Sequence, residues 1–190
     1  MSELSSARAV NPQFTASPEL LLRAQAIKVV FFDVDGVLTD GGLYFGPEGE
    51  QLKRFNTLDG HGLKMLQAAG VVPAVVSGRD SPALRVRLAA LGVTHTVLGT
   101  EDKLPAAERI LQELGLNWYA AAVMGDDWPD LPLLRRAALA CVPSGGHVEC
   151  LALAHWVPQA LAGHGAAREL CDVVVLASGH YRRLLEQAAR

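Results

Sequence analysis

The chain of 190 residues carries 17 basic and 20 acidic side chains, for a net charge of −3, and 50% of its residues are hydrophobic. This length suits one compact domain with a substantial core, and the charge excludes the strongly basic surface that binds nucleic acid or anionic membranes. Three widely spaced cysteines, Cys141, Cys150 and Cys171, favour reduced thiols in a cytoplasmic protein. We find no apolar run long enough for a signal peptide or a membrane span.

The first elements expected along the chain are a leader, a helix, a strand and a hairpin. Residues 1–25 form the leader, and we expect its first dozen residues to be disordered. Within the leader, Ser17-Pro18-Glu19 predicts the start of a short helix that ends near Ala24. The apolar run 27–34 predicts a buried strand, and residues 43–55 predict a β-hairpin with glycine and proline at its tip.

After the hairpin, helices and strands alternate. Helices are expected at 60–69, 81–91, 103–114, 128–136, 147–153 and 166–177, and strands at 71–76, 94–98, 120–124, 138–142 and 155–157. Alternation at this spacing predicts an α/β fold, a Rossmann-like parallel sheet with helices on both faces. We expect one domain over 26–179, with the hairpin as its only sizeable insertion, and a C-terminal helix or tail at 180–190.

Polar side chains follow the predicted strands, at the edge where parallel sheets bind ligands. The first strand ends in Asp33-Val34-Asp35, the second in Ser77-Gly78-Arg79 and the fourth in Gly125-Asp126-Asp127, while Lys103 begins the helix after the third. Asp33 and Asp35 lie two apart, so on a strand their side chains would start on the same side. Asp130 lies one helical turn beyond the later aspartates.

These carboxylates predict metal-assisted phosphoryl transfer. Asp33, Asp35 and Asp126 would repel one another, and Mg²⁺, which prefers carboxylate oxygens, water and phosphate, would relieve that repulsion. One carboxylate can attack phosphorus to give an aspartyl-phosphate, while another protonates the leaving oxygen and later activates water. Ser77 and Lys103 can hold the phosphoryl oxygens. Each residue alone has an ordinary role, as a turn, a helix terminus or a solvated lysine, and only their joint placement favours catalysis.

Four segments resemble the four motifs of haloacid dehalogenase-superfamily phosphatases. They are residues 33–40 (DVDGVLTD), Ser77, Lys103 and residues 125–130 (GDDWPD). The resemblance implies that Asp33 is the nucleophile and Asp35 the general acid/base. It implies that Mg²⁺ is bound by the carboxylates of Asp33 and Asp126 and by the backbone carbonyl of Asp35. It also implies that Ser77 and Lys103 bind the phosphoryl group, with Asp127 and Asp130 as supporting residues.

Residues 26–179 resemble more narrowly the 3-deoxy-D-manno-octulosonate (KDO) 8-phosphate phosphatases. The match is carried by residues 55–62 (FNTLDGHG), 77–79 (SGR), 92–95 (GVTH) and 163–172 (GHGAARELCD). The resemblance implies the capless form of the fold with a β-hairpin after the first motif. It also implies a homotetramer whose hairpins form a central barrel and whose neighbouring subunits help close each active site. The implied substrate is a phosphorylated eight-carbon keto-sugar that feeds lipopolysaccharide synthesis.

Five residues are expected to bind the substrate: Asp59, Gly60, His61, Arg79 and Arg168. Arg79 either meets a carboxylate or phosphate of the substrate or is a surface arginine. Arg168 either reaches a neighbouring subunit's site or pairs with Glu169 or Asp172, and His61 either faces the site or is structural.

The chain departs from the family pattern at two places. The family usually has Arg where this chain has His164, and Ala-Asp-Ala where it has Ser144-Gly145-Gly146. Both departures bear on which substrate is bound rather than on phosphoryl transfer. A nine-carbon keto-sugar phosphate is therefore the closest alternative substrate.

Other functions and other hairpin placements stay open at this point. A phosphotransferase or mutase would need a closing lid, and no segment is large enough to form one. A non-catalytic assembly module would have no need of the acidic and basic residues at the strand ends. The hairpin either packs on its own domain or forms an oligomer interface, and we expect the interface because of its apolar side chains, which are Leu43, Tyr44, Phe45, Leu52 and Phe55.

Overall fold

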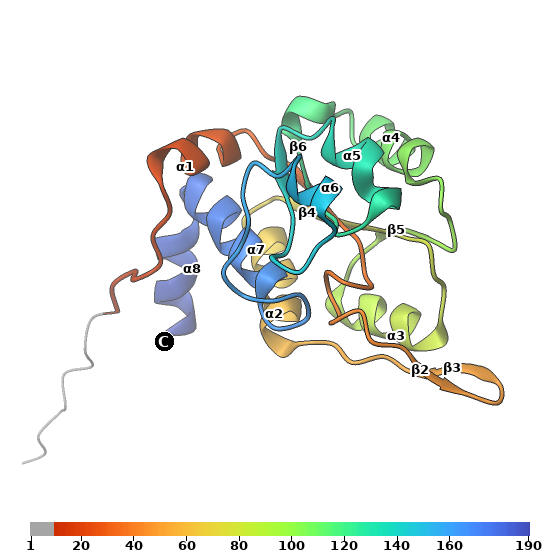
Figure 1. Ribbon diagram of the computed structural model, residues 1–190. Helices are drawn as coiled ribbons and strands as arrows, with labels where there is room; N and C mark the ends of the chain where they lie inside the picture. Colours follow the sequence, from red (N-terminus) through yellow and green to blue (C-terminus); the bar gives the residue numbers. More distant parts are fainter. Residues whose placement is uncertain (1–9) are drawn as a thin grey trace, which may run out of the picture.

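The computed structural model describes residues 10–190, and Figure 1 shows the course of the chain. The disorder expected for the first dozen residues falls largely outside these residues. Helix α1 (Pro18–Ala24) begins where predicted, because the Ser17 hydroxyl accepts a hydrogen bond from the Leu20 amide and Pro18 occupies the first turn. Within residues 10–190, no helix is long and apolar enough to cross a membrane.

Five strands form one parallel sheet: β1 (Val29–Phe32), β4 (Val72–Ser77), β5 (His95–Leu98), β6 (Ala121–Met124) and β7 (Leu139–Cys141). Their order is β5-β4-β1-β6-β7, and all neighbouring strands pair in parallel. The chain runs outward from β1 to β5 and then returns to the other side of β1. This reversal of direction places a ligand-binding crevice at the carboxyl end of β1.

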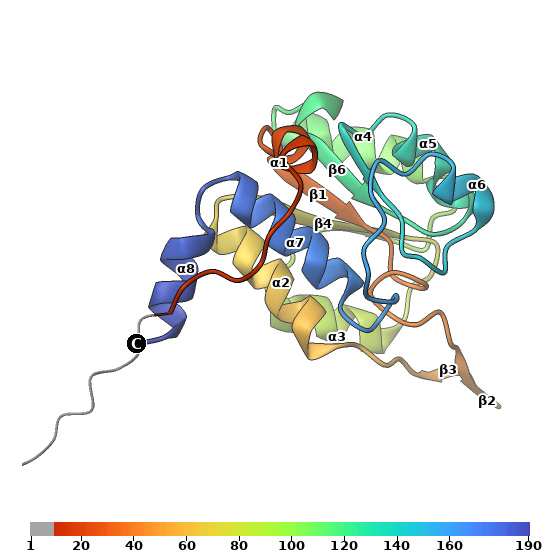
Figure 2. The same cartoon turned by 60° about the vertical axis from the view of Figure 1, so that its left-hand side comes forward.

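Helices cover both faces of the sheet, as Figure 2 shows. One face is covered by α1, α2 (Thr57–Ala68), α3 (Pro82–Leu91) and α7 (Ala166–Ala177), and the other by α4 (Lys103–Glu113), α5 (Leu131–Leu134) and α6 (Val148–Leu151). Along β1, Val30 and Phe32 face the first layer, while Val29 and Phe31 face the second. The predicted fold class, a parallel sheet between helices, is confirmed.

Several element boundaries differ from the predictions. α2 begins at Thr57 rather than 60, because the Asn56 side chain caps it by accepting a hydrogen bond from the Leu58 amide. The helix expected at 128–136 is a 3₁₀ turn (Trp128–Asp130) followed by α5. The strand expected at 155–157 is a single bridge between Trp156 and Cys141.

The C-terminal segment, which was expected to be a helix or a tail, is helical. Residues 180–190 contain helix α8 (Tyr181–Ala188), and Arg183 in this helix donates a hydrogen bond to the Ala68 carbonyl at the end of α2. The three cysteines are free and buried, which agrees with the predicted thiols.

The hairpin consists of β2 (Tyr44–Gly46) and β3 (Gly49–Leu52) and projects from the body of the molecule (Figure 1). Gly49 at its tip has a φ of +104°, a conformation that side chains disfavour. Phe45 and Leu52 are 63% and 67% exposed. Phe45 and Leu52 are therefore not buried on their own domain, whereas Phe55, which follows the hairpin, packs partly buried against the core.

Candidate active site

A pocket of about 200 Å³ lies at the carboxyl ends of β1, β4 and β6. Its lining consists of Asp33, Asp35, Ser77, Gly78, Arg79, Glu101, Lys103, Asp126, Asp127, Pro129 and Asp130. The pocket therefore brings together residues from all four segments that resemble the phosphatase motifs, although these segments are separate in the chain. The strand order explains this convergence, because β4 and β6 flank β1 on either side.

Lys103 joins two buried carboxylates at the base of the pocket. Its Nζ lies 2.7 Å from Asp33 Oδ1 and 2.7 Å from Asp130 Oδ1, and all three side chains are buried. Burial alone would lower the pKa of Lys103, but the charges and hydrogen bonds of Asp130 and Asp33 outweigh it, and the pKa is raised. Lys103 is therefore a permanent cation next to Asp33.

Asp33 and Asp126 are carboxylates whose charged forms are disfavoured. Burial, followed by the charge of Asp130, raises the pKa of Asp33 to about 6 despite the opposing effect of Lys103. Burial, followed by the charges of Asp33 and Asp130, raises the pKa of Asp126 to about 7. Such shifts are typical of sites that bind a further cation.

The carboxylates fit a hard divalent cation. Asp33, Asp126 and Asp130 each offer an oxygen, and these oxygens lie within 4.8 Å of one another. Asp126 Oδ1 is buried and has no hydrogen-bond partner among residues 10–190. A buried carboxylate oxygen without a donor is costly unless a cation or water satisfies it, and oxygen ligands of this kind suit Mg²⁺.

Asp130 supports the loop that carries Asp126. Its Oδ2 accepts hydrogen bonds from the amides of Asp126, at 3.0 Å, and Asp127, at 3.4 Å, and forms a capping box with Asp127. The loop also depends on glycine. A Cβ at Gly125 would lie 2.4 Å from the Asp130 side chain, and one at Gly36 would lie 2.1 Å from Asp126 Oδ2.

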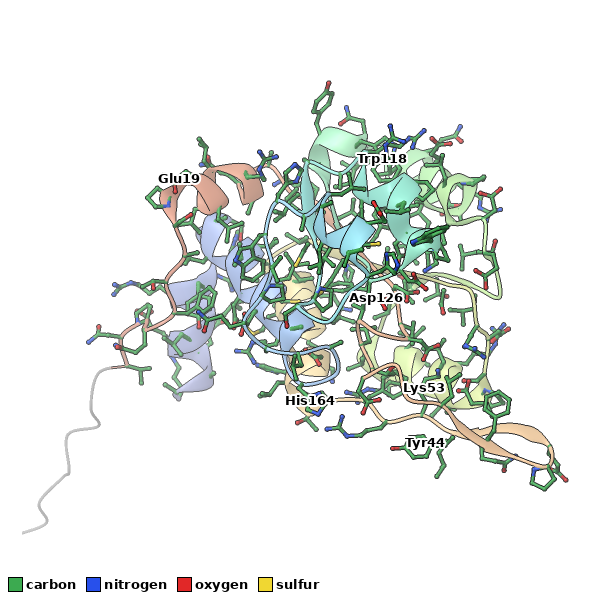
Figure 3. The ribbon with its side chains drawn as sticks, viewed as in Figure 1. Glu19, Tyr44, Lys53, Trp118, Asp126 and His164 are labelled. Atoms are coloured by element: carbon green, nitrogen blue, oxygen red, sulfur yellow. The ribbon has the colours of Figure 1, made fainter. Side chains whose placement is uncertain are left out.

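Asp35 differs from its predicted setting. Because β1 ends at Phe32, Asp33 and Asp35 follow the strand, and the strand-period argument for their shared side does not apply. Asp35 Oδ1 instead forms an ion pair with Lys53 Nζ from the base of the hairpin. Arg79 Nε lies 3.8 Å from the other oxygen, Asp35 Oδ2. Figure 3 labels Lys53 on the hairpin arm and Asp126 at the edge of the sheet.

Two residues of the site were missed in the sequence. Lys53 also lies 3.2 Å from Glu50, and its side chain is only 1% exposed. It precedes the Phe55-Asn56 segment that carries the family resemblance, but chain order gives no sign that the hairpin base folds onto Asp35. Glu101 lies against the Ser77-Gly78 turn, where a Cβ at Gly78 would be 2.6 Å from Glu101 Oε1.

Four of the expected substrate-binding residues do not line this pocket; Arg79 is the fifth and does. Asp59 is buried between α2 and α7 and accepts hydrogen bonds from the amides of Gly165, at 3.3 Å, and Arg168, at 2.9 Å. Burial raises the pKa of Asp59, while these backbone donors oppose the shift. Gly60 packs against Arg87, which a Cβ would approach to 2.2 Å.

His61 and Arg168 line a different cavity, of about 340 Å³, beside Tyr181. The Arg168 Nε donates to both carboxylate oxygens of Asp172, each at 3.0 Å. Within one chain, Arg168 therefore takes the second of its two predicted roles, pairing with Asp172.

No family model matches the chain. The chain is 35% identical over 163 residues to the 3-deoxy-D-manno-octulosonate 8-phosphate phosphatase KdsC of Salmonella typhimurium, a match that covers 86% of this chain and 87% of that protein. A probable YrbI family phosphatase from Pseudomonas syringae pv. phaseolica superposes with a TM-score of 0.89 at 42% identity, covering 92% and 99% of the two chains.

A third similar protein is known with ligands. The structure of 3-deoxy-D-manno-octulosonate 8-phosphate phosphatase from Moraxella catarrhalis, in complex with magnesium ion, phosphate ion and KDO, superposes with a TM-score of 0.86 at 32% identity. The match covers 90% of this chain and 98% of that one. Sequence identity over most of both chains, a shared fold and a pocket lined by all four motifs agree with one another. The chain belongs to the KdsC family of 3-deoxy-D-manno-octulosonate 8-phosphate phosphatases, within the haloacid dehalogenase superfamily.

Proposed function

We propose that this protein hydrolyses the phosphomonoester of KDO 8-phosphate with Mg²⁺ as its cofactor. The observation that carries the proposal is the buried cluster in which Lys103 joins Asp33 to Asp130 beside the unpartnered oxygen of Asp126. The Moraxella catarrhalis relative, which contains magnesium, phosphate and KDO, supports both the cofactor and the substrate.

The proposed reaction has two steps on Asp33. A carboxylate oxygen of Asp33 attacks phosphorus, the bond from phosphorus to the sugar oxygen breaks, and Asp35 gives that oxygen a proton. Asp35 then takes a proton from water, which attacks the phosphorus of the aspartyl-phosphate, releases inorganic phosphate and restores Asp33. The Lys103 ammonium, 2.7 Å from Asp33 Oδ1, is placed to attract the phosphoryl oxygens as their charge changes.

The metal would be bound by the carboxylates of Asp33 and Asp126 and by the backbone carbonyl of Asp35. Bound Mg²⁺ supplies positive charge that offsets the repulsion between these carboxylates and the phosphoryl group. Asp130 and Asp127 keep the Asp126 loop in place through their capping hydrogen bonds.

Three further side chains complete the proposal: Arg79 at the mouth of the pocket, Lys53 from the hairpin base and Ser77 at the end of β4. Arg79 is 47% exposed, and its guanidinium can meet the carboxylate of a keto-sugar acid. Lys53 orients Asp35 from the hairpin base, so that one oxygen stays directed toward the leaving group. Ser77, whose Oγ accepts a hydrogen bond from the Arg79 amide, is placed to bind a phosphoryl oxygen.

We further propose a homotetramer assembled through the hairpins, with neighbouring subunits closing each site. The exposed apolar side chains of the hairpin support this assembly. His61 and Arg168 would then contribute to substrate binding only in a neighbouring subunit's site. Asp59 and Gly60 are buried within their own chain, which favours a structural role for both.

The test is phosphate release from a panel of sugar phosphates by the wild type and Asp33→Asn, with Mg²⁺ and with EDTA. We expect Mg²⁺-dependent turnover of KDO 8-phosphate and a loss of at least about a thousandfold in the variant, because no other carboxylate replaces the nucleophile. A preference for a nine-carbon keto-sugar phosphate would change the assigned substrate but leave the proposed reaction unchanged. Phosphate transfer to an added sugar would indicate a phosphotransferase, and no turnover would favour an assembly module.

A further inference from the structure

Trp128, which lies between the pocket-lining residues Asp127 and Pro129, forms a contact with His147 that the proposed reaction does not use. Trp128 follows the acidic pair of the fourth motif and is 60% exposed. Its indole Nε1 donates a hydrogen bond to His147 Nδ1 at 3.1 Å. The two rings meet edge to face, with their centroids 5.6 Å apart and an interplanar angle of 89°.

The backbone of His147 contacts the same loop a second time. Its amide donates a hydrogen bond to the Asp126 carbonyl at 2.7 Å. His147 therefore bonds both ends of the three-residue segment from Asp126 to Trp128. Within that segment, the Trp128 amide donates to Asp127 Oδ1 at 2.8 Å, so the segment is fixed at each residue.

The ring of His147 is held in a single tautomer. Its Nδ1 accepts hydrogen bonds from the Trp128 indole and from the Glu149 amide, the latter at 3.2 Å. A nitrogen that accepts from two N–H donors carries no proton, so the ring proton lies on Nε2.

Glycine at position 146 lets this loop approach Asp126 closely. A Cβ at Gly146 would lie 2.6 Å from Val142 Cγ1 and 3.3 Å from the Asp126 carbonyl oxygen. This position belongs to the Ser144-Gly145-Gly146 segment, in which the chain departs from the family pattern. The departure therefore lies directly behind the backbone of Asp126.

We propose that the Trp128–His147 pair is a positioning element for Asp126. By bonding both ends of the segment, His147 and Trp128 hold the Asp126 peptide so that its unpartnered Oδ1 stays directed toward the divalent cation. Partners outside the ligand shell commonly change metal affinity because they fix the orientation of the ligand. The inference rests on the proposed function, which makes Asp126 a Mg²⁺ ligand.

If His147 only stabilised the fold, its substitution would have a different effect. His147 also caps α6, because its side chain accepts from the Glu149 amide, and loss of that cap would lower stability without a specific effect on the metal. The variant His147→Asn separates the two roles. Asparagine is a good N-cap that can still accept from Glu149, but its side chain is too short to reach the Trp128 indole.

The experiment measures Mg²⁺ binding by titration calorimetry in the absence of substrate. It uses the wild type, Trp128→Phe, His147→Asn and the double variant, and it records the melting temperature of each metal-free protein. Trp128→Phe keeps an aromatic edge against the imidazole but removes the donor. Tyr119→Phe, at an exposed aromatic outside the pocket, is the control.

We expect each single variant to weaken Mg²⁺ binding about tenfold and the double variant to bind no more weakly than the singles, because both remove the same contact. The metal-free melting temperatures should match the wild type, and kcat on the substrate should recover at saturating Mg²⁺. Unchanged Mg²⁺ affinity in the single variants would overturn the proposal. The proposal would also be overturned if the double variant lost Mg²⁺ affinity by the product of the two single losses. The same holds if the loss of Mg²⁺ affinity in each variant followed its loss of melting temperature without metal.

The outcome is independent of the substrate assignment. If the wild type binds Mg²⁺ but does not hydrolyse KDO 8-phosphate, the proposed function fails, while the calorimetric comparison still decides whether the pair positions Asp126.

Discussion

At the scale of single residues, folding buries carboxylates close to one another, and their ionised forms destabilise the folded state. Burial raises the pKa values of Asp33 and Asp126 to about 6 and about 7, whereas an aspartate in an unfolded chain titrates near pH 4. Between about pH 4 and 7 the folded metal-free protein therefore binds protons that the unfolded chain does not. The stabilising contribution of these groups is greatest at low pH and is lost as pH rises through the folded-state pKa values.

This sign predicts how Asp126→Asn changes stability. The amide cannot ionise, so it removes the repulsion that grows with pH. We compare the free energy of unfolding of the wild type with that of the variant, both in EDTA. Between pH 4.5 and 7.5 the wild type should lose roughly 1–3 kcal/mol relative to the variant, a range that allows for solvent screening. Urea unfolding at several pH values measures the difference. A difference that stays constant with pH would contradict the raised pKa of Asp126.

The sequence predicts a site residue well when a strand end places it in the site, and poorly when a tertiary contact does. Asp33 follows β1, Ser77 is the last residue of β4 and Asp126 lies two residues beyond the end of β6, so any parallel sheet with this strand order gathers them. Lys53 reaches Asp35 only because a hairpin stem bends back, a tertiary contact that no local pattern encodes. For Asp59, the prediction of substrate binding rests on the resemblance of its glycine-rich segment to the family, whereas in the structure its carboxylate oxygens accept hydrogen bonds from two backbone amides at the start of α7.

At the scale of elements, the junction of α2 and α7 depends on Asp59. This buried carboxylate on α2 accepts two backbone hydrogen bonds from the first turn of α7 and the residue before it. We expect Asp59→Ala to lower the free energy of unfolding by about 1–3 kcal/mol, because it leaves the amides of Gly165 and Arg168 without their acceptor. Chemical denaturation of the Ala variant measures this loss.

The matched control is Asp59→Asn, which keeps one acceptor oxygen and should lose less stability. At a temperature where the variants are folded, both should retain the KM of the wild type. A large rise in KM without a loss of stability would instead restore Asp59 to the predicted substrate-binding set.

The helices and strands differ in how well local sequence predicts them. Ser17-Pro18 and Ser81-Pro82 gave correct helix starts, because a capping hydroxyl and a proline in the first turn act locally. The start of α2 lies three residues earlier than predicted, because the side chain that caps it is Asn56. The strand expected at 155–157 is reduced to one bridge, between Trp156 and Cys141 of β7.

At the scale of the whole molecule, the hairpin carries exposed apolar side chains on a projecting arm. Phe45 and Leu52 lie on an arm that projects from the body, as does Tyr44, which Figure 3 labels. We expect Phe45→Asp and Leu52→Asp to reduce the molar mass in solution from that of a tetramer to that of smaller species, because each puts a charge into the proposed interface. Light scattering after size-exclusion chromatography measures the mass.

Leu22 provides the control for this experiment. It is 74% exposed on α1, which lies on the opposite side of the molecule from the hairpin in Figures 1 and 2, so Leu22→Asp should keep the mass of the wild type. A wild type that is monomeric at micromolar concentration, or hairpin variants with unchanged mass, would contradict the proposed assembly.

The ion pair between Lys53 and Asp35 also limits where the hairpin can change in sequence and length during evolution. The stem is anchored at Lys53, and three residues later Asn56 caps α2, so the segment between them has no slack to absorb an insertion. The tip is free of such anchors, because Pro47 and Glu48 are exposed and Gly49 has open space around it. Insertions and substitutions should therefore accumulate at the tip, while the spacing from Lys53 to the Asn56 cap of α2 stays constant.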